Sequence, residues 1–167
     1  MNMNNNQNQL DPRLHFVVAT AIIVKDGKYL IAKRAAHEKV FPNKWTVPGG
    51  KLVLNEYKNL PQTADYQQWY NVVDWVLRKE VMEEVGLEIN RPQYVCDLVF
   101  VRPDGYPVVT LSYWAEHKDG EVKLGKELSE HAWVTLEEAK NYDLIEGIWD
   151  EIKMVDDHRK SIKTSLV

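Results

Sequence analysis

The sequence predicts an α/β fold in which one mixed β-sheet lies between α-helices. Strand-like segments come first and last, at 16–32 and 94–134, around one helical segment at 64–85. Strands that flank a central helix in this order favour a single mixed sheet with helices packed against it. The length of 167 residues and the 44% hydrophobic content suit one domain with a full hydrophobic core.

The first half of the chain begins with a β-hairpin. Apolar strands are expected at 16–24 and 29–32, because an Asp-Gly turn at 25–28 separates them. A short strand and a glycine turn follow at 45–51. The stretch 55–63 is expected to be irregular, since a proline interrupts it.

A long helix is expected next, from about Ala64 to Val85, with Gly86 as the left-handed cap that ends it. At about 100° per residue, apolar side chains line one side of this helix. This apolar ridge consists of Val73, Leu77, Val81 and Val85.

Three glutamates lie along the same helix, and one of them falls inside its apolar ridge. Glu84 projects between ridge residues, Glu80 lies at the edge of the ridge, and Glu83 is one step further round. Ionised carboxylates beside a core-facing surface are costly unless an opposite charge compensates them. A hard divalent cation compensates several converging carboxylates, so the helix is expected to form half of a metal site.

The second half of the chain supplies further strands and two more helices. Strands are expected at 94–101 and 108–115 around a turn, and a short strand at 132–134. A capping box at Thr135–Glu138 opens one helix, and the last helix is expected at 144–155.

The composition excludes several classes of function. A net charge of −4, from 21 basic and 25 acidic residues, does not suit broad binding to nucleic acid or to anionic membranes. No apolar stretch approaches the roughly 20 residues that span a bilayer, and the polar N-terminal residues lack the features of a signal peptide. The single Cys96 excludes an intrachain disulfide, so a reducing, cytoplasmic location is expected.

The acidic helix and the glycine turn before it resemble the signature of the Nudix hydrolases. That signature is written Gx5Ex7REUxEExGU, where U is an apolar residue, and it corresponds here to Gly50, Glu56 and the run 79–87. The order of the upstream segments is also similar to that family, and the likeness covers 14 to about 155. The resemblance implies the Nudix fold, a mixed, curved β-sheet sandwiched between α-helices.

The resemblance also implies the domain boundaries. A single Nudix hydrolase domain is expected at 13–158, after a disordered polar tail at 1–12 and before a C-terminal tail at 159–167. Inside the signature, 22 residues (57–78) instead of seven precede the helix motif, which is an insertion of 15 residues at about 57–72.

A second departure is Lys79, which stands where the family has arginine. In the family that arginine ties the helix to the first glutamate of the signature and orients the metal-binding carboxylates. Lys79 can pair with Glu56, but it cannot make the two-pronged contact of a guanidinium.

By analogy with the family, Glu80 and Glu84 bind Mg²⁺ directly, and Glu83 binds it directly or through water. Mn²⁺ is an expected substitute. The backbone carbonyl of Gly49 is a further ligand, because a glycine turn lets the chain approach an ion closely.

The general base has more than one candidate. Glu127, six residues before Trp133, resembles in position the loop glutamate of the nucleoside-triphosphate branch, where it would act as base or bind metal. Glu130 is its competitor, and in other members a glutamate of the helix is the base.

Two cations and four aromatic residues complete the expected site. Arg34 and Lys51 are candidates for binding substrate phosphates. The inserted aromatics could stack on a base or ribose, or pack onto the domain or onto a partner subunit in a homodimer. They are Tyr66, Trp69, Tyr70 and Trp75.

The resemblance therefore implies a Mg²⁺-dependent pyrophosphohydrolase. Its substrate would be a small molecule in which a nucleoside diphosphate is linked to another moiety, such as a nucleoside triphosphate or an ADP-ribose-like compound. The alternative is a non-catalytic nucleotide-sensing module on the same fold. An isopentenyl-diphosphate-isomerase-like relative is disfavoured, because Cys96 lies in a predicted strand far from the motif.

Overall fold

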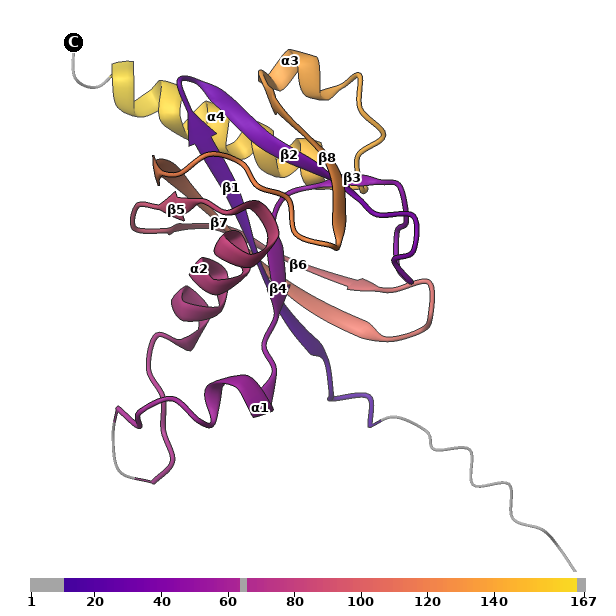
Figure 1. The fold of residues 1–167 in the computed structure, drawn as a ribbon, viewed down its shortest axis with the longest axis vertical. Helices are drawn as coiled ribbons and strands as arrows, with labels where there is room; N and C mark the ends of the chain where they lie inside the picture. Colours follow the sequence, from indigo (N-terminus) through magenta and orange to yellow (C-terminus); the bar gives the residue numbers. More distant parts are fainter. Residues whose placement is uncertain (1–10, 64–65, 165–167) are drawn as a thin grey trace, which may run out of the picture.

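A computed structural model of the chain describes residues 11–63 and 66–164. Eight strands form one open mixed sheet, with α2 on one face and α3 and α4 on the other (Figure 1). The α/β class predicted from the sequence is therefore confirmed. The elements are β1 (Phe16–Lys25), β2 (Lys28–Arg34), β3 (Trp45–Thr46), β4 (Gly49–Lys51), α1 (Leu54–Tyr57), α2 (Val72–Val85), β5 (Glu88–Ile89), β6 (Gln93–Val101), β7 (Pro107–Asp119), β8 (Leu128–Val134), α3 (Leu136–Ala139) and α4 (Ile148–Thr164).

Strand β1 is the centre of the sheet. It runs parallel to β7 from the pair Phe16–Val108 to the pair Val24–Glu116, and antiparallel to β2 and β4. Strand β2 pairs with β1 and β3 along one side and with β8 along the other, because Ala32 faces both Thr46 of β3 and His131 of β8. Strand β7 carries β5 and β6. The parallel pairing joins segments about 90 residues apart, which local sequence patterns do not reveal.

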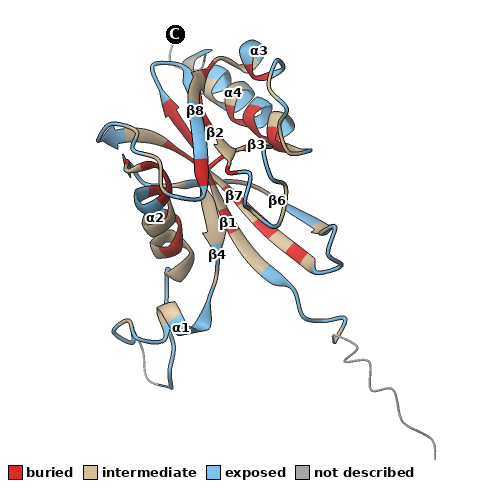
Figure 2. Cartoon of the chain, turned by 45° about the vertical axis from the view of Figure 1, so that its right-hand side comes forward, coloured by how far each residue is buried: buried red, intermediate tan, exposed pale blue. Residues whose placement is uncertain are grey.

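Two hydrophobic cores lie on opposite faces of the sheet, because side chains alternate along each strand. Ala19, Ala21 and Ile23 of β1 pack toward α2, whereas Ile22 and Val24 pack toward α4. Figure 2 shows buried residues along the strands and on the sheet-facing sides of both helices. The ridge of α2 is in the first core, where Leu77, Val81 and Val85 are fully buried and Val73 is partly buried.

Helix α2 begins later than the sequence predicts. The helix starts at Val72 instead of Ala64, because Tyr66, Gln67 and Asn71 adopt positive φ angles of 70°, 55° and 61° that a helix cannot contain. Its end is as predicted: Gly86 has a φ of 68° and its N–H donates to the carbonyl of Met82.

The last helix also differs from the prediction. Helix α4 runs from Ile148 to Thr164 instead of from 144 to 155, so most of the tail expected at 159–167 is helical. Its start is delayed because Leu144 bridges to Trp45 and Gly147 has a φ of 92°. The polar tail expected at 1–12 lies almost wholly outside the described residues.

Two further elements extend or add to the prediction. The stretch expected to be irregular contains the short helix α1, and β8 starts at Leu128, four residues before the predicted strand. In the described part of the insertion, the indole Nε1 of Trp69 donates to the carbonyl of Leu60 at 3.0 Å, and its ring lies 5.5 Å from that of Tyr57. Trp69 of the insertion therefore packs against α1, whereas Tyr66 and Tyr70 are exposed.

A buried polar chain connects α4 to the centre of the sheet. The hydroxyl of Ser112 donates to Glu151 at 2.7 Å and lies 3.1 Å from the hydroxyl of Thr20. Burial raises the pKa of the Glu151 carboxyl above its ordinary value of 4.5, against the hydrogen bond from Ser112, and Asp150 adds a smaller effect in the same direction as burial.

This pKa gives a pH dependence of stability. Above pH 4.5 the unfolded chain releases the Glu151 proton while the folded chain still holds it, so the free energy of unfolding falls as pH rises toward the folded-state pKa. Glu151→Gln keeps an acceptor for Ser112 and removes the titration. We expect this variant to gain stability relative to the wild type between pH 5 and 8 in urea unfolding. A difference that stays constant over this range would contradict the assignment.

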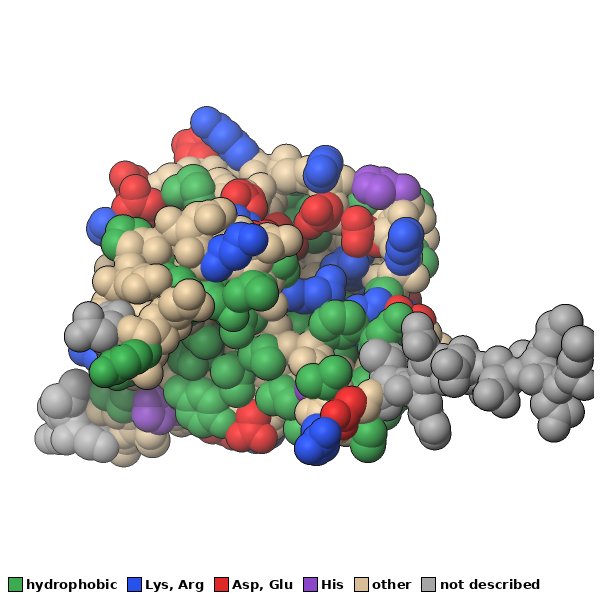
Figure 3. Space-filling model, turned by 90° about the horizontal axis from the view of Figure 1, so that it is seen from below, with side chains coloured by type: hydrophobic (Ala, Val, Ile, Leu, Met, Phe, Trp, Pro, Cys, Tyr) green, Lys and Arg blue, Asp and Glu red, His purple; other side chains and the backbone are tan. Residues whose placement is uncertain are grey.

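Apolar side chains gather on the face of the molecule seen from below (Figure 3). Among the strands of the described residues, β6 pairs only with β7, and its residues Val99 and Val101 are exposed. Near the start of β1, the guanidinium of Arg102 lies over the rings of Phe16 and Tyr106. The homodimer expected from the sequence stays a prediction, which light scattering of the purified protein can test.

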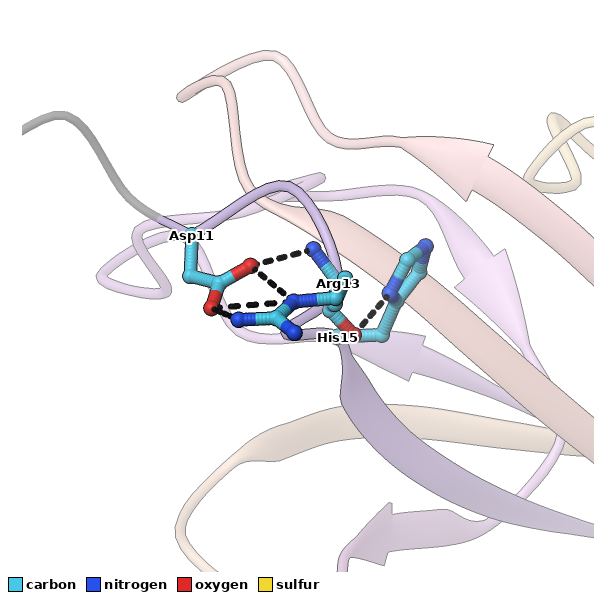
Figure 4. A network of polar contacts seen from close by, with 3 residues as sticks. All are labelled: Asp11, Arg13 and His15. Carbon is cyan, nitrogen blue, oxygen red and sulfur yellow. Dashed lines mark hydrogen bonds and ion pairs between the residues drawn. The ribbon is translucent and has the colours of Figure 1, made fainter.

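The segment that leads into β1 is held by local polar contacts. The guanidinium of Arg13 donates to both carboxylate oxygens of Asp11, and the carbonyl of Arg13 lies 3.2 Å from the His15 ring nitrogen Nδ1 (Figure 4).

No helix in the described part of the chain is both long and apolar enough to cross a membrane.

Candidate functional site

A cavity of about 270 Å³ lies beside the second half of α2. Helix α2, the short helix α1 and the loop before β8 each contribute to its lining. The lining residues are Glu56, Lys79, Glu80, Glu83, Glu84, Gly125, Lys126 and Glu127. Segments far apart in the sequence thus bring five carboxylates and two ammonium groups to one place.

Strand β4 holds two of these glutamates close to the sheet. The backbone N–H of Gly49 donates to the carboxylate of Glu84 at 2.9 Å. A Cβ atom on Gly50 would lie 2.2 Å from the carboxyl carbon of Glu80. The glycine turn therefore lets the backbone approach both carboxylates, which a larger residue at Gly50 would prevent.

Glu84 is the buried member of the glutamate set, with 8% of its surface exposed. The predicted position inside the apolar ridge is therefore confirmed. The pKa of Glu84 is raised to about 8, mainly by burial, and the charges of Glu80 and Glu127 contribute to this rise. The hydrogen bond from Gly49 and the charge of Arg34 act in the opposite direction. A carboxylate at this position is ionised at neutral pH only if positive charge is supplied nearby.

Lys79 carries a positive charge inside the cavity, where it contacts three glutamates other than Glu84. Its ammonium nitrogen lies 3.0 Å from Glu83, 3.1 Å from Glu80 and 3.4 Å from Glu56. Burial lowers the pKa of Lys79, but the hydrogen bonds to Glu83 and Glu80 outweigh it and raise the pKa above its ordinary value. The pairing with Glu56 that the sequence predicts is present, as a single contact.

The loop before β8 is anchored to the end of α2. The N–H groups of Lys123 and Gly125 donate to the carbonyls of Val85 and Glu84 at 2.9 and 2.8 Å. These carbonyls belong to the last turn of the helix and have no partner inside it. A Cβ atom on Gly125 would lie 2.5 Å from the carbonyl oxygen of Glu83, so this approach requires glycine.

The two candidate general bases lie in different places relative to the cavity. Glu127 lines the cavity, and its charge contributes to the raised pKa of Glu84. Glu130 lies on β8, outside the cavity, and pairs with Lys33 at 2.7 Å. The geometry therefore places Glu127, and not Glu130, beside the helix glutamates.

The two cations expected to bind phosphate do not line this cavity. Arg34 donates to Glu38 at 2.6 Å and to the carbonyl of Val40 at 2.9 Å, so its guanidinium is held within its own loop. Lys51 is exposed at the end of β4. Lys126 was not singled out in the sequence, although it precedes Glu127 directly; only the anchored loop brings it to the cavity.

The donor set of the cavity fits a hard divalent cation. All five acidic groups are oxygen donors. The buried Oε2 of Glu56 accepts no hydrogen bond in the described residues, although it lies 3.4 Å from the Lys79 ammonium. With Lys79 between the carboxylates, no three acidic, histidine or cysteine side chains among the described residues are already gathered around one point. Binding an ion there requires the Lys79 ammonium and the glutamates to rearrange.

Comparison with known proteins shows which proteins the chain is similar to. No family model matches the chain. Its sequence is 27% identical over 140 residues to nucleoside triphosphatase NudI from Klebsiella pneumoniae, covering 78% of this chain and 89% of that protein. In sequence the chain is therefore similar to a nucleoside triphosphatase, and in structure it is similar to the Nudix hydrolases.

Solved structures show that the fold is the Nudix fold. The MutT Nudix hydrolase from Burkholderia pseudomallei superposes with a TM-score of 0.67 at 22% identity, over 85% of this chain and 98% of that one. The Nudix domain of Shewanella oneidensis NrtR, solved with ADP ribose, superposes with a TM-score of 0.66 at 15% identity, over 95% and 99% of the two chains.

Proposed function

We propose that this protein is a Nudix hydrolase that cleaves a diphosphate linkage in a nucleoside triphosphate, with Mg²⁺ as its cofactor. The observation that carries the proposal is the buried Glu84, held by the Gly49 N–H and placed beside Glu80 at the cavity. A carboxylate buried against the core at this position needs a cation, and a phosphate chain needs the same cation to approach an acidic cavity. The nucleoside triphosphatase relatives favour a triphosphate substrate.

Each acidic residue has a distinct role in this proposal. Glu80 and Glu84 hold the ion directly, with the backbone carbonyl of Gly49 as a further ligand, and Glu83 holds it directly or through water. Glu56 orients Lys79, which keeps the carboxylates together in the absence of the ion. When bound, Mg²⁺ neutralises phosphate oxygens and acidifies a water molecule.

Glu127 is the general base in this proposal, at the mouth of the cavity. It is exposed and reaches the cavity from the anchored loop, so it can receive a proton from an attacking water and pass it to solvent. Mn²⁺ should replace Mg²⁺, because both take octahedral oxygen coordination.

The test is a panel of nucleotides incubated with purified protein and Mg²⁺ or Mn²⁺. We expect a phosphorylated product from at least one nucleoside triphosphate, and none when a chelator removes the metal. The panel includes ADP-ribose, because a structural neighbour is solved with that ligand. A folded protein that is inert across the whole panel would support the non-catalytic nucleotide sensor instead.

A further inference from the structure

Lys126 is a second cation at the cavity, and its ammonium is not committed to a neighbour. Lys79 is bound by three glutamates, whereas no carboxylate of the described residues lies within ion-pairing distance of Lys126. Lys126 lines the cavity and is exposed, so its charge is accessible to solvent. This ammonium is therefore free to bind an anion that enters the cavity.

The loop carrying Lys126 is fixed independently of any ligand. The hydrogen bonds from Lys123 and Gly125 to the last turn of α2 hold it in place, and Gly125 lies against the carbonyl of Glu83. A side chain on an anchored backbone loses less freedom on binding than one on a mobile loop. Lys126 is thus positioned in advance on the rim of the acidic cavity.

The size and charge of the cavity indicate which part of a substrate meets Lys126. About 270 Å³ is below the roughly 300–1,000 Å³ of pockets that enclose whole small molecules. The cavity suits a phosphate chain with its ion, which leaves the base and ribose outside. The ion compensates the glutamates, so the phosphates need a further positive group, which a lysine ammonium supplies as a point charge.

We propose that Lys126 binds the phosphate chain of the substrate and favours triphosphates over diphosphates. The inference rests on the proposed function and adds a binding residue that neither the signature nor Arg34 and Lys51 supply. A triphosphate brings more negative charge to the glutamates than a diphosphate does. Its binding therefore depends more on the Lys126 ammonium.

The experiment compares steady-state kinetics of the wild type with Lys126→Ala, Lys126→Arg and Lys123→Ala. Lys123 is the matched control, because it is an exposed lysine of the same loop that does not line the cavity. We expect Lys126→Ala to raise KM for a nucleoside triphosphate about tenfold with a smaller change in kcat, and to raise KM for the diphosphate less. Lys126→Arg should restore most of the affinity, and Lys123→Ala should match the wild type.

The salt dependence of KM is a second measurement that a purely structural role would not alter. Removing a cation that binds phosphate should weaken the rise of KM with ionic strength in Lys126→Ala but not in Lys123→Ala. An active wild type together with equal KM values for Lys126→Ala and Lys123→Ala would overturn this inference alone. A wild type that hydrolyses no nucleotide would overturn the proposed function as well.

Discussion

Glu84→Gln is expected to lower turnover by about 100-fold or more while leaving the protein folded. Several kcal/mol of transition-state stabilisation depend on the cation, and each 1.4 kcal/mol corresponds to a factor of ten in rate. Glutamine has nearly the same shape and can still accept the Gly49 N–H, so the contact at 2.9 Å survives without the charge. Stability without metal should not fall, because a neutral amide is less costly to bury than a carboxylate.

Glu130→Gln is the matched control for this measurement. The same chemical change is made at a glutamate of β8 that lies outside the cavity and pairs with Lys33. An exposed ion pair contributes at most about 1 kcal/mol to stability, so Glu130→Gln should retain turnover close to that of the wild type. Equal activity in the two variants would show that the buried glutamate has no role in the reaction.

Gly50→Ala is the second change with a large expected effect, and it acts through Glu80. The new Cβ atom would lie 2.2 Å from the Glu80 carboxyl carbon, so the carboxylate must swing away. Because the displaced group is the end of a flexible side chain, the fold should tolerate the change. A displacement of about 1 Å in a catalytic group can cost about 100-fold in rate, and we expect a loss of this order together with weaker affinity for Mg²⁺.

Gly49→Ala is the contrasting variant, because the atom that the new Cβ would meet there belongs to the backbone and cannot swing away. Its Cβ would lie 2.4 Å from the carbonyl oxygen of Ala19, which is part of the paired strand β1. This variant should lose stability as well as activity, whereas Gly50→Ala should keep its melting temperature within a few degrees. Wild-type turnover in a folded Gly50→Ala protein would contradict the placement of Glu80 at the cavity.

Helical periodicity was sufficient to find the acidic half of the site. The ridge of α2 and the position of Glu84 inside it follow from the spacing of apolar residues, and both are present in the structure. The capping box at Thr135 and the left-handed cap at Gly86 were also found, because each is a local hydrogen-bond pattern with its own residue signature.

The features that the sequence did not reveal depend on contacts between distant segments. Asn71 and Gln67 adopt left-handed backbone conformations that their residue types do not require. Nothing in the sequence therefore indicates that α2 begins as late as it does. Lys126 reaches the cavity only because Gly125 docks on the helix end about 40 residues earlier. A glycine in a loop does not show which surface it approaches.

Lys79 holds the carboxylates of the cavity together. One ammonium group contacts three glutamates, with its contact to Glu56 the longest at 3.4 Å. Glu56 is in turn held by α1, whose Tyr57 packs against Trp69 of the insertion. The insertion therefore supports the glutamate that a lysine holds less firmly than an arginine would.

The most direct test of metal binding at the cavity is a crystal structure of the wild-type protein grown with Mn²⁺, in which anomalous scattering locates the ion. We expect a Mn²⁺ peak at the cavity, with carboxylate oxygens of Glu80 and Glu84 as ligands and the Lys79 ammonium displaced toward Glu56. A cavity that shows no peak at saturating Mn²⁺, with Lys79 still bound to the same glutamates, would contradict the account.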